Sequence, residues 1–525
     1  MSAEHGRFRA MNGPSISRRR FLASTGAWLG ASAAGIAAAN DKTRTVSIFH
    51  TTDLHGHIVP TKTYTGIENV GGFARCATCI RQWRRESPDS LLLDIGDVYQ
   101  GTAESLVNNG NLMIGLFNRL GYDAWTLGNH DLDWGPEILE KNLSLSKPPV
   151  LTANIRVTGK APGSLDGAWK NVLPWMMKEV GGFRIALIGL ITPGLPYWLA
   201  RETLGGVSVA HPLESLRQSI ADAKSARADA IVVMGHMGWR KEDDFANPVR
   251  EILKLAPGVD VFLAAHTHQD QPSWKSSGVV CTQASYYGIH CGRVDLTFDL
   301  ETRKLVDRRA VTRLMDQSFE LDPAVMEMAE PDLKKAAEQL SRKVATVTTT
   351  IKGTGGNNPL ARLFCEIFSD ALKRNQTPVD GVFHGTFGTG DLAAGDLTVA
   401  DCWKLLPYEN LLATVELSAE ELIEILKEER HVKTSDRILW PFELKLKRTG
   451  EVVSFERNGK PVAAGSRFTI ALNSYDAQSG GQAMMRLREI VSQPSAKRTT
   501  TRIDTRSALI DGFLERKEIP RQEIP

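Results

Sequence analysis

The sequence has few cysteines, no excess of charge of either sign and no uninterrupted apolar run long enough to cross a bilayer. Six cysteines in 525 residues are too few for a disulfide scaffold, although Cys281 and Cys291 could pair across neighbouring strands. The 63 lysines and arginines nearly balance the 61 aspartates and glutamates, which argues against a nucleic-acid sleeve or a polybasic membrane surface. We therefore expect no nucleic-acid polymer among the partners.

The first 39 residues resemble an export signal. The segment Ser17-Arg18-Arg19-Arg20-Phe21-Leu22 precedes a weakly apolar stretch that ends in Ala37-Ala38-Ala39. This pattern is typical of a cleaved twin-arginine signal, and the stretch is shorter than the ~20 residues that span a bilayer. We predict a twin-arginine signal peptide over residues 1–39, a mature chain starting at Asn40 or Asp41, and a periplasmic or extracellular protein without a stable membrane span. An uncleaved anchor or a disordered basic tail is the alternative.

The length predicts more than one domain, because a single core stops growing near ~250 to 300 residues. Near-continuous apolar strands alternate with helical stretches from residue 43 onwards, as at 90–94, 185–188 and 261–265. Such alternation is typical of α/β folds in which helices cover both faces of a β-sheet. We predict a layered α/β domain over residues 41–315. A linker helix, a smaller α/β domain and a tail are predicted over 316–346, 347–516 and 517–525.

Metal-ligand residue types recur directly after the predicted strands. The seven candidates are Asp53, His55, Asp97, Asn129, His236, His266 and His268. In an open α/β sheet, ligands bind at the carboxyl ends of the strands, so five separate segments converge on one edge. The Asp97 carboxylate could bridge two cations ~3.5 to 4 Å apart. Imidazoles combined with carboxylates suit zinc, manganese or iron better than calcium, so we predict a pair of divalent metal ions.

The motifs at these strand ends resemble the signature of the calcineurin-like metallophosphoesterases. They are Asp53-Leu54-His55, Gly96-Asp97, Gly128-Asn129-His130-Asp131-Leu132-Asp133, Gly235-His236 and His266-Thr267-His268. Their order, together with the second domain, resembles the bacterial periplasmic family of 5'-nucleotidases, UDP-sugar hydrolases and 2',3'-cyclic phosphodiesterases. This resemblance covers nearly all of residues 43–515.

The resemblance implies a role for each of these residues. One metal would be bound by Asp53, His55, Asp97 and His268, and the other by Asp97, Asn129, His236 and His266. It assigns transition-state stabilisation or leaving-group protonation to His130, oriented by Asp133. A carboxylate behind an imidazole fixes the tautomer and favours the charged form, which agrees with this role. The implied reaction is in-line attack of a metal-bound water on phosphorus.

The second domain matches the family less well. The resemblance makes Arg362 a candidate phosphate clamp and Tyr475 a candidate stacking ring, with Phe442 or Trp440 as the second ring. Two positions depart from the family pattern. Thr389 stands where a second arginine is expected, and Gln482 changes the Gly-Gly-Asp-Gly loop. For Asn154, a turn residue and a substrate-side role are about equally favoured.

The resulting hypothesis is an exported di-metal hydrolase of 5'-nucleotides or related phosphomonoesters and diphosphates. A first alternative is hydrolysis of thiosulfonate groups in sulfur oxidation on the same metal core, which the altered phosphate clamps favour slightly. A second alternative is a non-catalytic metal-binding or ligand-binding protein, but such a protein would not need the pair of His130 and Asp133. We expect a monomer that binds a small-molecule phosphoester.

Overall fold

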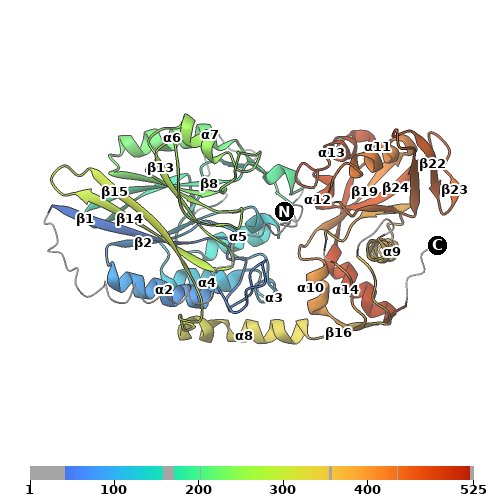
Figure 1. The fold of residues 1–525 in the computed structure, drawn as a ribbon, viewed down its shortest axis with the longest axis horizontal. Coiled ribbons are helices and arrows are strands. Elements are labelled where there is room, and N and C mark those ends of the chain that lie inside the picture. The colour runs from blue at the N-terminus through green and yellow to red at the C-terminus, as the bar shows by residue number, and fades with distance from the viewer. Residues whose placement is uncertain are drawn as a thin grey trace, which may run out of the picture.

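The computed structural model describes residues 42–157, 169, 171–200, 203–353, 358–388, 390–433 and 435–520. The predicted signal peptide, the predicted start of the mature chain and Thr389 lie outside these described residues. The described chain forms two lobes, and helix α8 (Pro323–Leu340) runs beneath the first lobe towards the second (Figure 1). The lobes are called the N-terminal and C-terminal domains below.

Two β-sheets face each other in the N-terminal domain (Figure 1). The seven-stranded sheet has the order β15 (Leu305–Leu314), β14 (His290–Asp299), β1 (Thr43–Thr51), β2 (Ser90–Asp94), β3 (Ala124–Thr126), β4 (Val150–Leu151) and β6 (Val172–Leu173). The six-stranded sheet has the order β12 (Asp270–Ser276), β13 (Val279–Ala284), β11 (Val261–Ala264), β10 (Ala230–His236), β8 (Phe183–Ile191) and β7 (Trp175–Val180). Buried side chains of both sheets, among them Ile48, Leu93, Leu187 and Val232, pack together between them.

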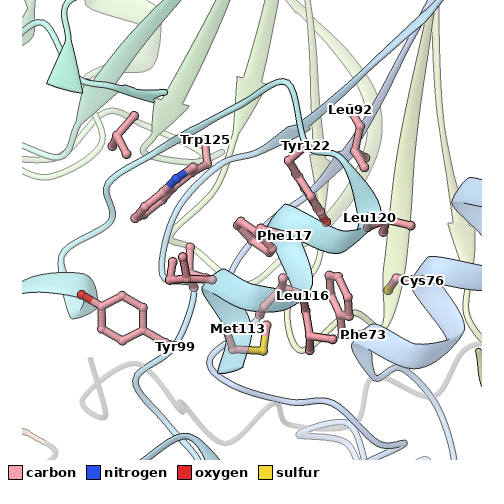
Figure 2. Packing of buried hydrophobic residues seen from close by; sticks show 14 of the residues in the cluster. Phe73, Cys76, Leu92, Tyr99, Met113, Leu116, Phe117, Leu120, Tyr122 and Trp125 are labelled. Atoms are coloured by element: carbon pink, nitrogen blue, oxygen red, sulfur yellow. The ribbon is translucent and has the colours of Figure 1, made fainter. Parts of the chain in front are cut away.

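Helices cover the outer faces of both sheets, so the predicted layered α/β class is confirmed. The first sheet is covered by α2 (Phe73–Glu86), α4 (Asn111–Leu120) and α5 (Pro136–Leu145), and the second by α6 (Pro212–Ser225) and α7 (Val249–Leu255). Figure 2 shows the first of these layers, where Phe73 and Phe117 pack near Tyr122 and Trp125.

Local sequence explains where these helices form. Helix α2 buries Phe73, Cys76, Ile80 and Trp83, which recur every three or four residues and therefore lie on one face. Helix α4 ends at Leu120 and is followed by Gly121, whose φ of 73° is left-handed and allows the chain to reverse after the last turn.

All six cysteines are free, so Cys281 and Cys291, whose pairing the sequence leaves open, form no disulfide in this structure. Cys281 lies on β13 in the six-stranded sheet and packs in the core beneath α6 and α7. Cys291 lies on β14 in the seven-stranded sheet and packs in the core beneath α2 and α4. The two strands follow each other in sequence but belong to different sheets.

The C-terminal domain is built on a five-stranded sheet. Its order is β20 (Ile438–Trp440), β17 (Gly381–His384), β24 (Arg467–Asn473), β19 (Leu411–Ser418) and β25 (Thr499–Asp504). One apolar core includes α9 (Pro359–Arg374), α10 (Val399–Leu405) and α14 (Thr505–Arg516), and a second includes α11 (Ala419–Glu429) and α13 (Met485–Val491).

Three small sheets and three short helices complete the described elements named here. The sheets are β18 (Gly395–Thr398)–β16 (Lys343–Val347)–β26 (Glu518–Ile519), β21 (Phe442–Leu446)–β22 (Val452–Arg457)–β23 (Lys460–Pro461), and β5 (Ile155–Val157)–β9 (Val207–Val209). The helices are α3 (Ala103–Leu106), η2 (His130–Leu132) and α12 (Ser474–Ala477). Strand β26 lies inside the predicted tail and pairs with β16, so the tail contributes to the fold.

Candidate active site

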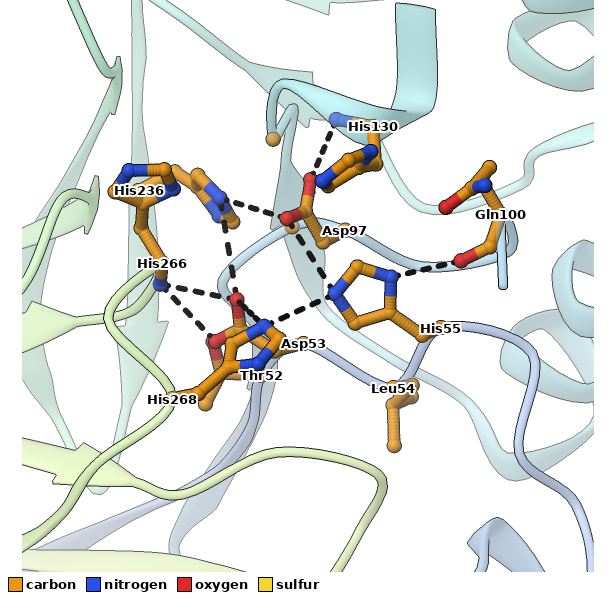
Figure 3. A network of polar contacts seen from close by, with 12 residues as sticks. Thr52, Asp53, Leu54, His55, Asp97, Gln100, His130, His236, His266 and His268 are labelled. Carbon is orange, nitrogen blue, oxygen red and sulfur yellow. Dashed lines mark hydrogen bonds and ion pairs between the residues drawn. The ribbon is translucent and has the colours of Figure 1, made fainter. Parts of the chain in front are cut away.

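The candidate metal ligands follow parallel strands, whose carboxyl ends meet at one edge of each sheet. Strands β1, β2 and β3 are parallel neighbours, as are β8, β10 and β11. The loop after β1 carries Asp53 and His55, the loop after β2 carries Asp97, and β10 ends at His236. Figure 3 shows these side chains together with His266 and His268, which follow β11. The structure thus brings six of the seven predicted ligands together, and the seventh, Asn129, follows β3.

The donor side chains form two groups that share Asp97. In the first group, one donor atom from each of Asp53, His55, Asp97 and His268 lies within 4.8 Å of the others. Asp97, His236 and His266 form the second group by the same measure. The Oδ2 atom of Asp97 is 3.1 Å from Nε2 of His236 and 3.6 Å from Nε2 of His55, so this carboxylate stands between the groups.

The donor set fits a pair of divalent cations. Four buried donor atoms in the second group and beside it make no hydrogen bond among the described residues: Asp97 Oδ2, Asn129 Oδ1, His236 Nε2 and His266 Nδ1. A buried polar atom without a partner costs about 1–3 kcal/mol, and converging acceptors are satisfied together by a cation. Imidazole and carboxylate donors match zinc, manganese or iron. We therefore describe this cluster as a candidate binuclear metal centre.

Five of the seven predicted ligands have a left-handed backbone. The φ angles are 49° at Asp53 and His55, 56° at Asp97, 71° at His266 and 54° at His268. Left-handed backbone in a non-glycine residue costs of order 1–3 kcal/mol and persists only where its surroundings enforce it. At Asp53, His55 and Asp97, two backbone hydrogen bonds of 2.9 Å hold the loops, from Asp53 N–H to the Gly96 carbonyl and from His55 N–H to the Asp97 carbonyl.

Backbone carbonyls orient two of the imidazoles. Nδ1 of His55 lies 2.7 Å from the Gln100 carbonyl oxygen, and Nδ1 of His236 lies 2.7 Å from the Ile95 carbonyl oxygen. Because a carbonyl can only accept, each Nδ1 carries a proton and donates it. Each Nε2 then has a lone pair for a metal, and Nε2 of His55 lies 3.1 Å from Nε2 of His268, another donor of the first group.

Two residues that were not predicted support the centre. A Cβ atom on Gly128 would lie 2.2 Å from Asp97 Oδ1 and 2.6 Å from Cε1 of His236, so only glycine fits this position. The carboxylate of Asp131 accepts hydrogen bonds from the backbone N–H groups of Asp97, Val98 and Gly128 at 2.8–2.9 Å. Both residues lie inside the motif that predicted Asn129 and His130. That motif is the sequence signal that could have identified them.

His130 and Asp133 form the predicted pair. Nδ1 of His130 lies 2.6 Å from Oδ2 of Asp133, and the His130 backbone N–H donates to Asp97 Oδ1 at 2.8 Å. Burial disfavours the charged imidazole, but the carboxylates of Asp133 and Asp97 outweigh burial and raise the pKa of His130 to about 9. Burial raises the pKa of Asp133, and His130 opposes that rise. The free Nε2 of His130 can therefore hold a proton beside the metal centre.

A pocket opens beside His130, where the two domains meet. Four aromatic residues line it: Trp198 from the N-terminal domain, and Phe387, Tyr408 and Tyr475 from the C-terminal domain. The Tyr408 ring lies parallel to the His130 ring, with 5.6 Å between centroids. Among the residues that the structure describes, none of those lining this pocket is a lysine or an arginine.

Glu409 connects the domains at the pocket. Its carboxylate pairs with the buried Arg506 of its own domain. It also accepts hydrogen bonds from the Gln100 side chain at 3.0 Å and from the Trp134 indole at 3.4 Å. Both partners adjoin functional residues, because the Gln100 carbonyl orients His55 and Trp134 follows Asp133.

The structure places several of the predicted substrate contacts away from the pocket. Arg362 lies on α9 and pairs with Glu366, one turn further along the same helix, at 3.0 Å. It does not line the pocket. Phe442 is buried in the core of the C-terminal domain against Phe455 and Phe468. Trp440 likewise packs against a core of that domain.

Of the remaining candidates, Tyr475 lines the pocket. Gln482 lies in a turn in which its N–H donates to the Ser479 hydroxyl at 3.0 Å. Asn154 is structural, since its amide exchanges hydrogen bonds of 2.8 and 2.9 Å with the backbone of Ile191. Sequence reasoning missed Phe387 and Tyr408, although the loop Pro407-Tyr408-Glu409-Asn410 carries an aromatic ring beside polar residues directly before β19.

Both domains match known families, and these matches agree with the fold and the candidate metal centre. Residues 46–270 match the calcineurin-like phosphoesterase family, and residues 341–488 match the 5'-nucleotidase C-terminal domain. These matches place a calcineurin-like phosphoesterase region before a 5'-nucleotidase C-terminal region in this chain.

Named relatives support this assignment. The chain is 28% identical to the human 5'-nucleotidase over 53% of its own length and 51% of that protein, so it spans about half of this relative. It is 26% identical to the 5'-nucleotidase of Vibrio cholerae, over 74% of its own length and 76% of the relative.

Solved structures share the fold. A 5'-nucleotidase precursor from Thermus thermophilus superimposes with a TM-score of 0.67 and 23% identity, over 92% of this chain and 98% of that one. The sulfate thiohydrolase SoxB from the same organism superimposes with a TM-score of 0.60 and 18% identity, over 91% and 96% of the two chains. In the part of the chain that the structure describes, no helix is both long and apolar enough to cross a membrane.

Proposed function

We propose that this protein is an exported hydrolase of 5'-nucleotides or related phosphomonoesters that uses two divalent metal ions. The observation that carries the proposal is the aromatic pocket directly beside His130 and the candidate metal centre. A flat ring stacked on Tyr408 or Tyr475 would place its phosphate towards the centre, because Asn129 and His130 line the same pocket. The named relatives are 5'-nucleotidases, which agrees with this substrate class.

Each group in the centre has a chemical role in this proposal. Asp53, His55, Asp97 and His268 would hold one cation, and Asp97, Asn129, His236 and His266 the other. When bound, divalent cations supply Lewis-acid activation of a phosphoryl group and of a water molecule. His130, held by Asp133, carries a proton at Nε2 that it gives to the leaving oxygen. No side chain needs to form a covalent bond to the substrate.

The direct test is hydrolysis by the purified protein loaded with manganese or zinc. We expect phosphate release from AMP and from a generic aryl phosphate ester, and loss of release after chelation. A protein that binds both metals yet hydrolyses neither ester would contradict the proposal and favour a metal-binding protein without catalysis.

A second candidate function is hydrolysis of thiosulfonate groups. The pocket lacks a lysine or arginine among its described lining residues, and the predicted clamp Arg362 lies elsewhere. The fold is also shared with the sulfate thiohydrolase SoxB. A screen over nucleotides, sugar nucleotides, cyclic nucleotides and thiosulfonates separates the two candidates, and we expect the highest kcat/KM for a nucleoside monophosphate.

Export by the twin-arginine route is part of the proposal. It is supported by Ser17-Arg18-Arg19-Arg20-Phe21-Leu22 and the small residues before Asn40. In a bacterial host, we expect the processed chain in the periplasmic fraction. Changing Arg18 and Arg19 to lysine should retain the unprocessed chain in the cytoplasm, whereas unchanged export would contradict this route.

A further inference from the structure

Three tyrosines surround His268 in the first group of metal ligands. Tyr64 comes from the loop between β1 and α2, whereas Tyr286 and Tyr287 follow β13. The Tyr64 hydroxyl lies 2.8 Å from Nδ1 of His268 and 3.1 Å from the Tyr287 hydroxyl. The Tyr286 ring stacks on His268 at 5.1 Å and on Tyr64 at 4.3 Å between centroids, with interplanar angles of 17° and 12°.

Tyr287 extends this network to two other ligands of the first group. Its backbone N–H donates to the Asp53 carbonyl at 2.7 Å, and its ring meets the His55 ring edge-on at 5.7 Å. The φ of Tyr287 is 54°, so its backbone is left-handed like that of the ligands themselves. The three tyrosines therefore contact Asp53, His55 and His268, three of the four donors in the first group.

The hydrogen bonds agree with a metal on His268. A neutral imidazole that binds a cation through Nε2 carries its proton on Nδ1, and that proton is donated to the Tyr64 hydroxyl oxygen. The Tyr64 hydroxyl then donates its own proton to Tyr287. His55 and His236 use backbone carbonyls for the same purpose, so His268 differs in being oriented by a side chain.

The location of His268 explains why a side chain, and not a backbone carbonyl, accepts the hydrogen bond from its Nδ1. The His268 side chain is 13% exposed, compared with 5% for His55 and none for His236, so it lies at the rim of the centre. Tyr64 is itself about half exposed, at 49%. Its backbone N–H donates to the Tyr286 hydroxyl at 2.8 Å, which fixes the loop that carries it.

We propose that Tyr64 is a positioning residue that fixes the His268 ring through its hydroxyl, and that this contact sets how tightly the first metal position binds relative to the second. Tyr287 supports the Tyr64 hydroxyl, and Tyr286 packs against both rings. This inference rests on the proposed binuclear centre, but it concerns metal affinity and not the identity of the substrate. Changes to such outer contacts typically lower metal affinity or activity about 10- to 100-fold.

The test measures metal binding by the full-length Tyr64→Phe variant, because this change removes one oxygen and keeps the stacked ring. Metal-free protein is titrated with Mn²⁺ and followed by calorimetry and electron paramagnetic resonance, which separates a single ion from a coupled pair. We expect the first position to weaken about 10- to 100-fold, the second to keep its affinity, and the single-ion signal to persist over a wider range of Mn²⁺.

Two further variants control this experiment. Tyr197→Phe makes the same chemical change on a ring that packs edge-on against Phe245, 5.0 Å away and outside the centre, and should bind both ions like the unchanged protein. In a His268→Gln background, the Tyr64→Phe change should lose its effect, because the imidazole that it orients is gone.

An unchanged affinity of the first position in Tyr64→Phe would overturn the inference. Equal weakening of both positions, or a lowered Tm of the metal-free variant, would also overturn it, since Tyr64 would then be structural. If the unchanged protein binds no metal, the proposed function fails as well. If it binds two ions that Tyr64→Phe does not affect, only this inference fails.

Discussion

In the N-terminal domain, the metal-binding side chains stand on loops that hydrogen-bond to each other through the backbone, as between Asp53 and Gly96. The C-terminal domain reaches the same pocket through Phe387, Tyr408 and Tyr475. The first arrangement depends on backbone geometry and on a glycine at 128, whereas the second depends on which side chain each loop presents. The geometry of the candidate metal centre is thus fixed by the fold, while the aromatic wall of the pocket can change through single substitutions.

The largest effect is expected from Asp97→Asn, which tests the candidate metal centre of the N-terminal domain. The carboxylate stands between both ligand groups, so its loss should remove activity to below detection and lower the content of both metals. Metal content per chain and phosphate release are the measurements. Asp370→Asn, on an exposed residue of α9 that pairs with Arg516, is the matched control and should change neither. Full metal content in Asp97→Asn would contradict the shared-ligand assignment.

His130→Asn should separate chemistry from metal binding within the same domain. It removes an acid–base group that binds no metal in our assignment, so kcat should fall roughly 10²- to 10⁴-fold with both ions retained. The matched control is His211→Asn at the exposed start of α6. If His130→Asn instead emptied the centre, its role would be that of a ligand.

Tyr475→Ala tests the aromatic pocket wall that the C-terminal domain contributes. A lost stacking contact costs about 1–3 kcal/mol, or roughly 5- to 150-fold in kcat/KM for AMP. Hydrolysis of a phosphate ester without a ring, such as glycerol phosphate, should be unaffected. Phe442→Leu, on a buried ring outside the pocket, should change neither value. Equal losses on both esters would place Tyr475 in the chemistry and not in recognition.

The smallest effect is expected from Arg362→Ala. This residue makes a partly exposed ion pair with Glu366, and such pairs contribute about 0–1 kcal/mol to stability. We expect kcat/KM to stay within about twofold, since a surface change away from the site rarely alters function. A loss of tenfold or more for a nucleotide would restore Arg362 as a phosphate contact.

The sequence predicts the layered fold and the clustering of the ligands because strand ends are local features. A buried strand followed by Asp53 or His236 indicates both the element and the edge where its side chain emerges. The left-handed backbone of the ligands is not visible in the sequence, because only the bonds between loops enforce it.

Residues at the pocket wall were harder to predict, because they depend on contacts between distant segments. Phe387 and Phe442 are both aromatic residues near strand ends, yet one faces the pocket and the other the core. Likewise, Cys281 and Cys291 lie ten positions apart on consecutive strands that enter different sheets. Tertiary packing alone decides these cases.

The left-handed backbone at five metal ligands has a consequence for evolution in the laboratory. Glycine adopts this conformation without the strain that aspartate and histidine bear. The residue types best suited to bind metals are therefore poorly suited to the backbone conformation at these positions. Under selection for heat resistance alone, such sites are expected to drift towards glycine while the helices and sheets persist. Selection for turnover would have to oppose that drift at every round.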